Sequence, residues 1–119
     1  MLADGGALVI EGWFVADPSR FDRGQRLEAR DLSAGWMHLD ASRHDPTTQR
    51  ISGQQIVITE AGITLYPSHL RYTHPAELDL MAQLAGLAPA GRWGGWAGEA
   101  FTADSRAYIA CHTKPASRP

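Results

Sequence analysis

The sequence is short of the residues on which several kinds of protein depend. Its 119 residues include a single cysteine, Cys111, which excludes an internal disulfide and a cysteine-based zinc site. No apolar run is long enough to span a bilayer, and the first residues lack the charged start and apolar stretch of a signal peptide. We therefore expect a cytoplasmic protein in which Cys111 is a packed core thiol.

Positive charge is also scarce. The sequence has 11 Lys and Arg residues against 13 Asp and Glu residues, which gives a formal net charge of −2. The basic residues are scattered, and aromatic residues are not interleaved with them as a nucleic-acid stacking surface would require. We therefore expect no binding to nucleic acid or membranes.

The remaining composition indicates a folded chain. A hydrophobic content of 44% at this length suits a single domain over residues 1–119, with residues 114–119 as a frayed tail. Short apolar segments between turn residues, at the spacing of an antiparallel meander, predict strands. These strands are expected over residues 7–15, 26–32, 36–42, 54–59, 63–66, 91–96 and 105–112.

One segment has the pattern of a helix. Pro75 stands at a favourable first position, and Leu78, Met81 and Ala85 recur at helical spacing until Gly86. We expect the Leu78, Met81 and Ala85 stripe to pack on the sheet. The predicted fold class is therefore α+β, mostly antiparallel sheet with one main helix.

Three segments, in order, resemble class I SAM-dependent methyltransferases. Residues 2–11 are similar to the family's L-x-P-G-G-x-L-v-i-E segment, with Asp4 where proline is usual. Residues 70–87 resemble the family's helix before its sixth strand, and residues 93–109 resemble its last strand pair. The resemblance implies the C-terminal half of a small-molecule or natural-product methyltransferase, with the meander as an insertion that caps the substrate site and contributes to dimers.

The resemblance also implies what this chain does not supply. The family binds SAM through a Gly-rich loop and an acidic residue that precede the segments matched here, so we expect no methyl transfer by this chain alone. SAM would be bound only if a partner chain supplied the site. Gly91, Gly94, Gly95 and Gly98 are flanked by tryptophan and followed by no helix, so they are interpreted as turn and bulge positions.

The first strand carries the expectation of a partner. In the resembling family its counterpart is an interior strand, so the strand over residues 7–15 is left with an open apolar edge that invites pairing. We expect a homodimer or a SAM-binding partner chain to cover this edge, with Trp13 as an interface residue.

A period of two over residues 36–44 places Trp36, His38, Asp40, Ser42 and His44 on one face of a strand. Two histidines and a carboxylate suit acid/base chemistry, but the histidines lie roughly 20 Å apart in an extended strand, too far to share one metal. We expect no metal site and take His44 or His38 as a single catalytic base. The alternative is the polar outer face of a half-exposed strand.

A second group of candidates could bind a polar ligand. The resemblance places Tyr66, Arg71 and Tyr72 where substrate would approach, and Trp93 and Trp96 could line an apolar pocket. The alternative is that these rings pack at the surface.

Three functions remain open. The chain is the substrate-side half or subunit of a small-molecule methyltransferase, or a stand-alone homodimer that binds a metabolite or catalyses a cofactor-free cyclisation or isomerisation, or a non-catalytic interaction subunit.

Overall fold

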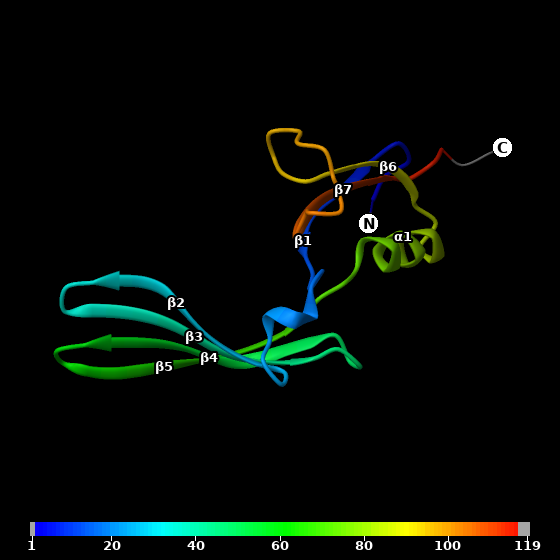
Figure 1. Ribbon diagram of the computed structural model, residues 1–119. Coiled ribbons are helices and arrows are strands. Elements are labelled where there is room, and N and C mark those ends of the chain that lie inside the picture. The colour runs from blue at the N-terminus through cyan, green and yellow to red at the C-terminus, as the bar shows by residue number, and fades with distance from the viewer. Residues whose placement is uncertain (1, 117–119) are drawn as a thin grey trace. The chain divides into compact units, whose positions relative to one another are not determined.

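The structure, a computed structural model, describes residues 2–116, which divide into two compact units. The first unit contains residues 2–16 and 73–116, and the second contains residues 17–72. Each unit has its own antiparallel sheet (Figure 1). The α+β class with mostly antiparallel sheet and one main helix is confirmed. The single domain over residues 1–119 stays a prediction, and the end of its expected frayed tail lies outside the described residues.

The first unit is a three-stranded sheet with one helix packed on it. The strands lie in the order β1-β7-β6, and helix α1 contacts β6 and β7. The elements are β1 (Ala7–Trp13), α1 (Pro75–Leu84), β6 (Ala88–Trp93) and β7 (Ala107–Thr113). Strand β7 is central, and its residues Tyr108, Ile109, Ala110 and His112 are buried. The core of this unit therefore follows the middle strand.

Strand β1 lies at an edge of this sheet, as the open-edge prediction requires. It pairs with β7 on one side, and no described strand pairs with its other side. Val9 is 51% exposed and Trp13 is 42% exposed. The neighbouring Gly5 and Gly6 form backbone hydrogen bonds with Lys114. The pairing therefore continues before the first residue of β1 and after the last residue of β7.

The face of α1 that packs on the sheet differs from the prediction. Met81 is 50% exposed and Ala85 is exposed, whereas Pro75 and Ala82 are buried. The predicted stripe was therefore wrong. The side chain that turns toward the sheet is the polar Asp79, the residue that follows Leu78. A polar residue on the packed face is invisible to a search for apolar periodicity.

The second unit is a four-stranded antiparallel meander in the order β2-β3-β4-β5. Its elements are the short 3-10 helix η1 (Pro18–Arg20), β2 (Gln25–Ser33), β3 (Trp36–Asp45), β4 (Arg50–Thr59) and β5 (Gly62–Arg71). Strands β4 and β5 are longer than predicted. Pro67 lies inside β5, which tolerates a missing backbone donor because β5 is an edge strand. The predicted meander is confirmed.

Cross-strand register gives this sheet two chemically different faces, because directly paired residues point to the same side. One face, here called the polar face, carries the predicted array of β3, including His38, Asp40 and His44, with Tyr66 of β5. The other, here called the apolar face, consists of three rows across the four strands. The rows are Leu32, Met37, Ile58 and Ile63; Ala29, Leu39, Ile56 and Leu65; and Leu27, Ala41, Gln54 and Pro67.

Candidate functional site

The structure brings two of the candidate residues into direct contact. His44 lies near the end of β3 and Tyr72 directly follows β5, and the His44 Nε2 atom lies 2.7 Å from the Tyr72 hydroxyl oxygen. Both residues are buried, with 6% and 4% of their surface exposed. The ring of Phe21 packs against the His44 ring at a centroid distance of 4.9 Å. An imidazole and a phenol are thus held together in an apolar environment.

Backbone contacts position this pair. The His44 amide donates to the Gly24 carbonyl oxygen at 2.8 Å. The Tyr72 amide donates to the Gln49 carbonyl oxygen, and the Gln49 side chain donates back to the Tyr72 carbonyl oxygen at 3.1 Å. These hydrogen bonds fix the backbone at both residues and so hold the two side chains within hydrogen-bonding distance of each other.

Burial shifts the titration of both partners. Burial lowers the pKa of His44, although the charge of neighbouring Asp45 opposes this shift. Burial also raises the pKa of Tyr72, and the Asp45 charge adds to this effect. Near neutral pH the pair therefore consists of a neutral imidazole and a protonated phenol that share one proton, the state required of a general base and its proton relay.

The other histidine of the array belongs to a separate set of contacts. His38 Nε2 lies 2.7 Å from the Gln55 side-chain oxygen, and its ring lies 6.2 Å from that of Trp36. Asp40 accepts a hydrogen bond from Arg30 at 2.9 Å, and this bond raises the pKa of Arg30. The carboxylate therefore pairs with a guanidinium, so its predicted role of orienting a histidine has no support in these contacts.

Tyr66 and Arg71 both lie on β5 of the second unit. Tyr66 is opposite Gln55 on β4, the residue that contacts His38, and is 55% exposed. Arg71 is the last residue of the strand, is exposed and directly precedes Tyr72. The structure thus places Tyr66 near the His38 contacts and Arg71 beside the His44 and Tyr72 pair along the chain.

The tryptophan candidates belong to the first unit. Trp93 ends β6 and is 37% exposed, and its ring covers Gly91, where any Cβ would collide with it. Trp96 is 69% exposed, and its indole nitrogen donates to the Glu11 carboxylate. The two tryptophans thus contact different neighbours, Trp93 the backbone at Gly91 and Trp96 the Glu11 side chain.

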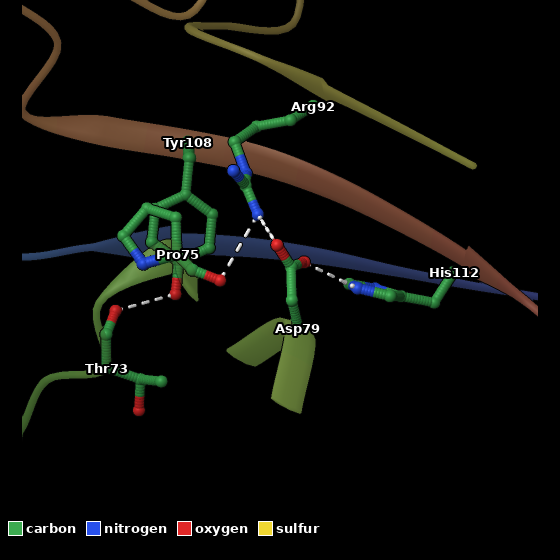
Figure 2. A network of polar contacts seen from close by, with 6 residues as sticks. All are labelled: Thr73, Pro75, Asp79, Arg92, Tyr108 and His112. Carbon is green, nitrogen blue, oxygen red and sulfur yellow. Dashed lines mark hydrogen bonds and ion pairs between the residues drawn. The ribbon is translucent and has the colours of Figure 1, made fainter. Parts of the chain in front are cut away.

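The most connected polar cluster was not predicted from the sequence. In Figure 2, Asp79 of α1 points at two residues of the sheet, accepting hydrogen bonds from Arg92 on β6 and from His112 on β7, the latter at 3.1 Å. Arg92 also donates to the Pro75 carbonyl oxygen at 3.2 Å, and the Tyr108 hydroxyl donates to the Thr73 carbonyl oxygen at 2.9 Å. These contacts attach α1, and the segment that precedes it, to the sheet.

The charge of Asp79 is stabilised by this cluster. Burial alone raises the pKa of its carboxyl group, but the hydrogen bonds from Arg92 and His112 and the electrostatic attraction of these side chains outweigh burial and lower it. His112 is 1% exposed, and its Nδ1 atom has no partner among the described residues. The cluster is therefore a part-buried polar link between helix and sheet. Asp79 lies four residues after the buried Pro75 and so on the same face of the helix, a spacing that could have indicated the cluster.

Among the described residues there is no cluster of metal ligands and no glycine loop at the start of a helix. Within residues 2–116 no group of three His, Cys, Asp or Glu side chains is placed to hold a metal. The glycine stretch is followed by β7 and not by a helix, a β-bulge lies between Pro89 and Gly91, and Gly98 has a positive φ of 83°. These are turn and bulge positions, as predicted, and they offer no row of helix N-terminal amides to a nucleotide-like cofactor.

Two smaller expectations concern other parts of the chain. Cys111 is a free thiol on β7 and is half-buried. Across residues 2–116, the only α-helix is too short and too polar to cross a membrane.

The fold has the architecture of part of a SAM-dependent methyltransferase. No protein-family model and no curated protein matches the sequence. Among solved structures, the CcbJ methyltransferase from Streptomyces caelestis is 38% identical to this chain, with a TM-score of 0.86, over 95% of this chain and 48% of that one. The chain therefore spans about half the length of this relative.

Two further structures show the same partial coverage. The amino pentose methyltransferase CalS10 from Micromonospora echinaspora, solved with SAM bound and involved in calicheamicin biosynthesis, is 26% identical over 95% of this chain and 45% of its own, with a TM-score of 0.53. A SAM-dependent methyltransferase from Clostridium acetobutylicum, 7% identical, has a TM-score of 0.74 over 97% of this chain and 47% of its own, and shows the fold alone. The resemblance to about half of a SAM-dependent methyltransferase is confirmed.

Proposed function

We propose that this chain forms the substrate-side part of a small-molecule SAM-dependent methyltransferase and that the SAM-binding residues lie on polypeptide outside it. The observation that carries the proposal is the 38% identity to the CcbJ methyltransferase over 95% of this chain and only 48% of that enzyme. A cytoplasmic location and a role in natural-product metabolism belong to the same proposal, the latter because CalS10 is involved in calicheamicin biosynthesis.

In this proposal His44 is the base that removes a proton from the methyl acceptor. Its lowered pKa keeps the imidazole neutral near pH 7, and the Tyr72 hydroxyl at 2.7 Å can exchange the shared proton with it. A methyl group transferred from a sulfonium needs an acceptor lone pair, so holding the acceptor deprotonated and correctly placed is what this half can contribute. His38 is the second candidate for the same role.

Binding of the acceptor is assigned to aromatic and cationic side chains, of which only Tyr72 is buried. In the second unit these are Tyr66, Arg71 and the hydroxyl of Tyr72, and in the first unit Trp93 and Trp96. Aromatic walls with a few polar groups are typical of small-ligand sites. For each of these residues we predict that its replacement raises KM for the acceptor more than it lowers kcat.

Partner binding is assigned to the open edge of β1. A strand with unpaired backbone groups and exposed Leu8 and Val9 is a template for another strand. A SAM-binding chain that adds a strand here would extend the three-stranded sheet and bring the cofactor site. A homodimer through the same edge is the alternative partner.

The test is recovery of the tagged chain from its own host, followed by native mass spectrometry and a transfer assay. The complex should contain a SAM-binding polypeptide and should transfer a tritiated methyl group from SAM to a panel of amino-sugar acceptors. The chain alone should neither bind SAM by calorimetry nor transfer the label. Turnover by the chain alone, or a complex without any SAM-binding component, would contradict the proposal.

A second candidate function is favoured by the His44 and Tyr72 pair itself. A neutral base hydrogen-bonded to a protonated phenol in a buried position can catalyse reactions that need proton transfer but no cofactor, such as an isomerisation or a cyclisation. This function would require a homodimer that retains a small metabolite without SAM. Retained ligand masses in the same native spectra distinguish the two functions.

A further inference from the structure

A hollow of about 1040 Å³ opens in the four-stranded sheet, lined by residues of all four strands and of the segment before β2. The register places it beside the apolar row that begins with Leu27, where a further row on the same side of the sheet is polar. This polar row consists of Gln25, Arg43, Ser52 and His69. Successive residues of a strand point to opposite faces, so Arg43 and His44 project on different sides. The hollow is therefore separate from the His44 and Tyr72 pair.

The charge of this lining is mainly positive. Arg23, Arg26 and Arg43 line the hollow with a single carboxylate, Asp22. Arg26 is paired with Glu28 at 2.5 Å. Within residues 2–116, however, no hydrogen bond or ion pair engages the guanidinium of Arg23 or Arg43. Two guanidinium groups with all their donors available attract an anion that can accept several hydrogen bonds.

The spacing of the polar row suits a tetrahedral anion. Arg43 and His69 lie on strands separated by β4, so their backbones are about 10 Å apart. Ser52 of β4 lies between them in the register. A phosphate group with hydrogen bonds of about 2.8 Å on either side fits between an arginine and an imidazole at this spacing. Its oxygens point in several directions and can accept from both side chains and from the serine, whereas a planar carboxylate has only two oxygens.

A buried oxygen atom of the same lining lacks a donor. The Oε1 atom of Gln54 is buried and has no hydrogen-bond partner among the described residues. An unsatisfied buried acceptor costs free energy, which a hydroxyl group of a ligand would recover by donating to it. Leu27 and Ala41 lie in the same row as Gln54 and also line the hollow. They offer an apolar surface to the carbon atoms of a ligand.

We propose that this hollow is a phosphate-binding site, occupied by a small phosphate ester or by free phosphate. The guanidinium groups of Arg23 and Arg43 and the imidazole of His69 bind the phosphate oxygens. The Ser52 hydroxyl donates to a further oxygen, and Gln54 accepts from a hydroxyl group of the ligand. Because the hollow and His44 lie on opposite faces, this is a second ligand site. It does not rest on the proposed methyltransferase function.

Calorimetry and amide NMR titrations of the full chain test the site with inorganic phosphate, glycerol phosphate and lactate as probes. We expect glycerol phosphate to bind with a Kd below about 1 mM at low salt and to shift the amide signals of Ser52 and Gly53. A Kd about tenfold higher for inorganic phosphate would assign the site to an ester, and equal values would assign it to free phosphate. Lactate, a carboxylate with a hydroxyl group, should bind at least about tenfold more weakly than either.

A pair of arginine variants separates a built site from general attraction of anions. Arg43→Gln should raise the Kd for glycerol phosphate about tenfold, because it removes charge-assisted hydrogen bonds to the phosphate. Arg50→Gln is the matched control, since Arg50 is an exposed residue of β4 outside the lining. The same loss of charge there should raise Kd less than about twofold. The amide spectra also show whether both variants keep the sheet.

Three results would overturn the proposal. The first is equal weakening by Arg43→Gln and Arg50→Gln, because net charge would then account for binding. The second is binding of lactate as tight as that of glycerol phosphate, because the site would then not distinguish a phosphate from a carboxylate. The third is the absence of any shift at Ser52 and Gly53 with either phosphate probe.

Discussion

The two units of this chain use burial for different purposes. The first unit buries apolar residues along its central strand and helix, with His112 among them. Its buried residues are Pro75, Ala82, Tyr108, Ile109, Ala110 and His112. In the second unit the only buried residues are His44 and Tyr72, which form a hydrogen-bonded pair.

The two units therefore differ in what their buried residues contribute to stability. Burying a polar pair costs free energy unless its hydrogen bonds are satisfied, and the bond between His44 and Tyr72 meets that requirement. The apolar side chains of this unit are meanwhile exposed on the apolar face. The second unit therefore buries a titratable pair and leaves apolar side chains exposed, whereas the first unit is organised around a core.

The largest expected effect concerns His44. Replacing it in His44→Gln should lower kcat for methyl transfer by the complete complex about 100-fold, because a general base contributes at least that factor. Stopped-flow or steady-state transfer of labelled methyl groups measures the change. Binding of SAM by the partner should be unaltered.

His38→Gln is the matched variant. It removes the other imidazole of the polar face and should change kcat less than about threefold, because His38 is hydrogen-bonded to Gln55 beside the Trp36 ring and not to a second titratable group in these contacts. The reverse ranking of the two variants would transfer the catalytic role to His38. Equal and small effects would remove both from catalysis.

The next effect concerns the first unit. Asp79→Asn removes the charge that links α1 to Arg92 and His112, and should lower the free energy of unfolding by about 2 kcal/mol, a value discounted because Asp79 is partly exposed. Amide hydrogen exchange in β7 measures the loss. Exchange in β3 should hardly change, because the link lies wholly within the first unit.

Gln83→Ala is the control for that prediction. Gln83 is an exposed residue one turn along the same helix, so its replacement by a residue of higher helix propensity should not destabilise the unit. Similar exchange in β7 for both variants would mean that the ionic link contributes nothing beyond helix propensity.

Much of the fold could be predicted from apolar patterning and turn residues. The meander and the helix start at Pro75 follow from residue periodicity and turn residues, whereas the open edge of β1 was expected from the resemblance to methyltransferases. Two features could not be predicted in this way. The extension of β5 through Pro67 depends on that strand being at an edge, and the buried face of α1 depends on Asp79 finding partners on β6 and β7.

The site could be predicted only in part, for a related reason. A strand period places His38 and His44 on one face, but it does not give their partners in other strands. The contact between His44 and Tyr72 joins residues 28 positions apart, and register across three strands is needed to find it. Asp40 lies opposite Glu28 in the register of β2 and β3 but bonds diagonally to Arg30, a contact that residue spacing along a single strand could not reveal.

The two units should lose stability in two different pH ranges. Because the pKa of His44 is lowered by burial, the unfolded chain binds more protons below about pH 6.5, and the second unit should lose stability as pH falls from there toward the folded pKa. The pKa of Asp79 is also lowered, so the first unit should lose stability only as pH falls below about 3.8. Amide exchange across the pH range should show β3 responding first. The upper range should disappear in His44→Gln and the lower range in Asp79→Asn.

The smallest expected effect concerns the partner of His44. Tyr72→Phe keeps the ring against the histidine and removes the hydroxyl at 2.7 Å, so the buried imidazole loses that hydrogen bond. The second unit should be destabilised by about 1 kcal/mol, the usual net contribution of one such bond. Tyr66→Phe removes a hydroxyl from a residue that is 55% exposed and should cost almost nothing. If hydrogen exchange in β3 responds equally to both substitutions, burial of the pair does not set the stability of this unit, and the contrast with the first unit fails.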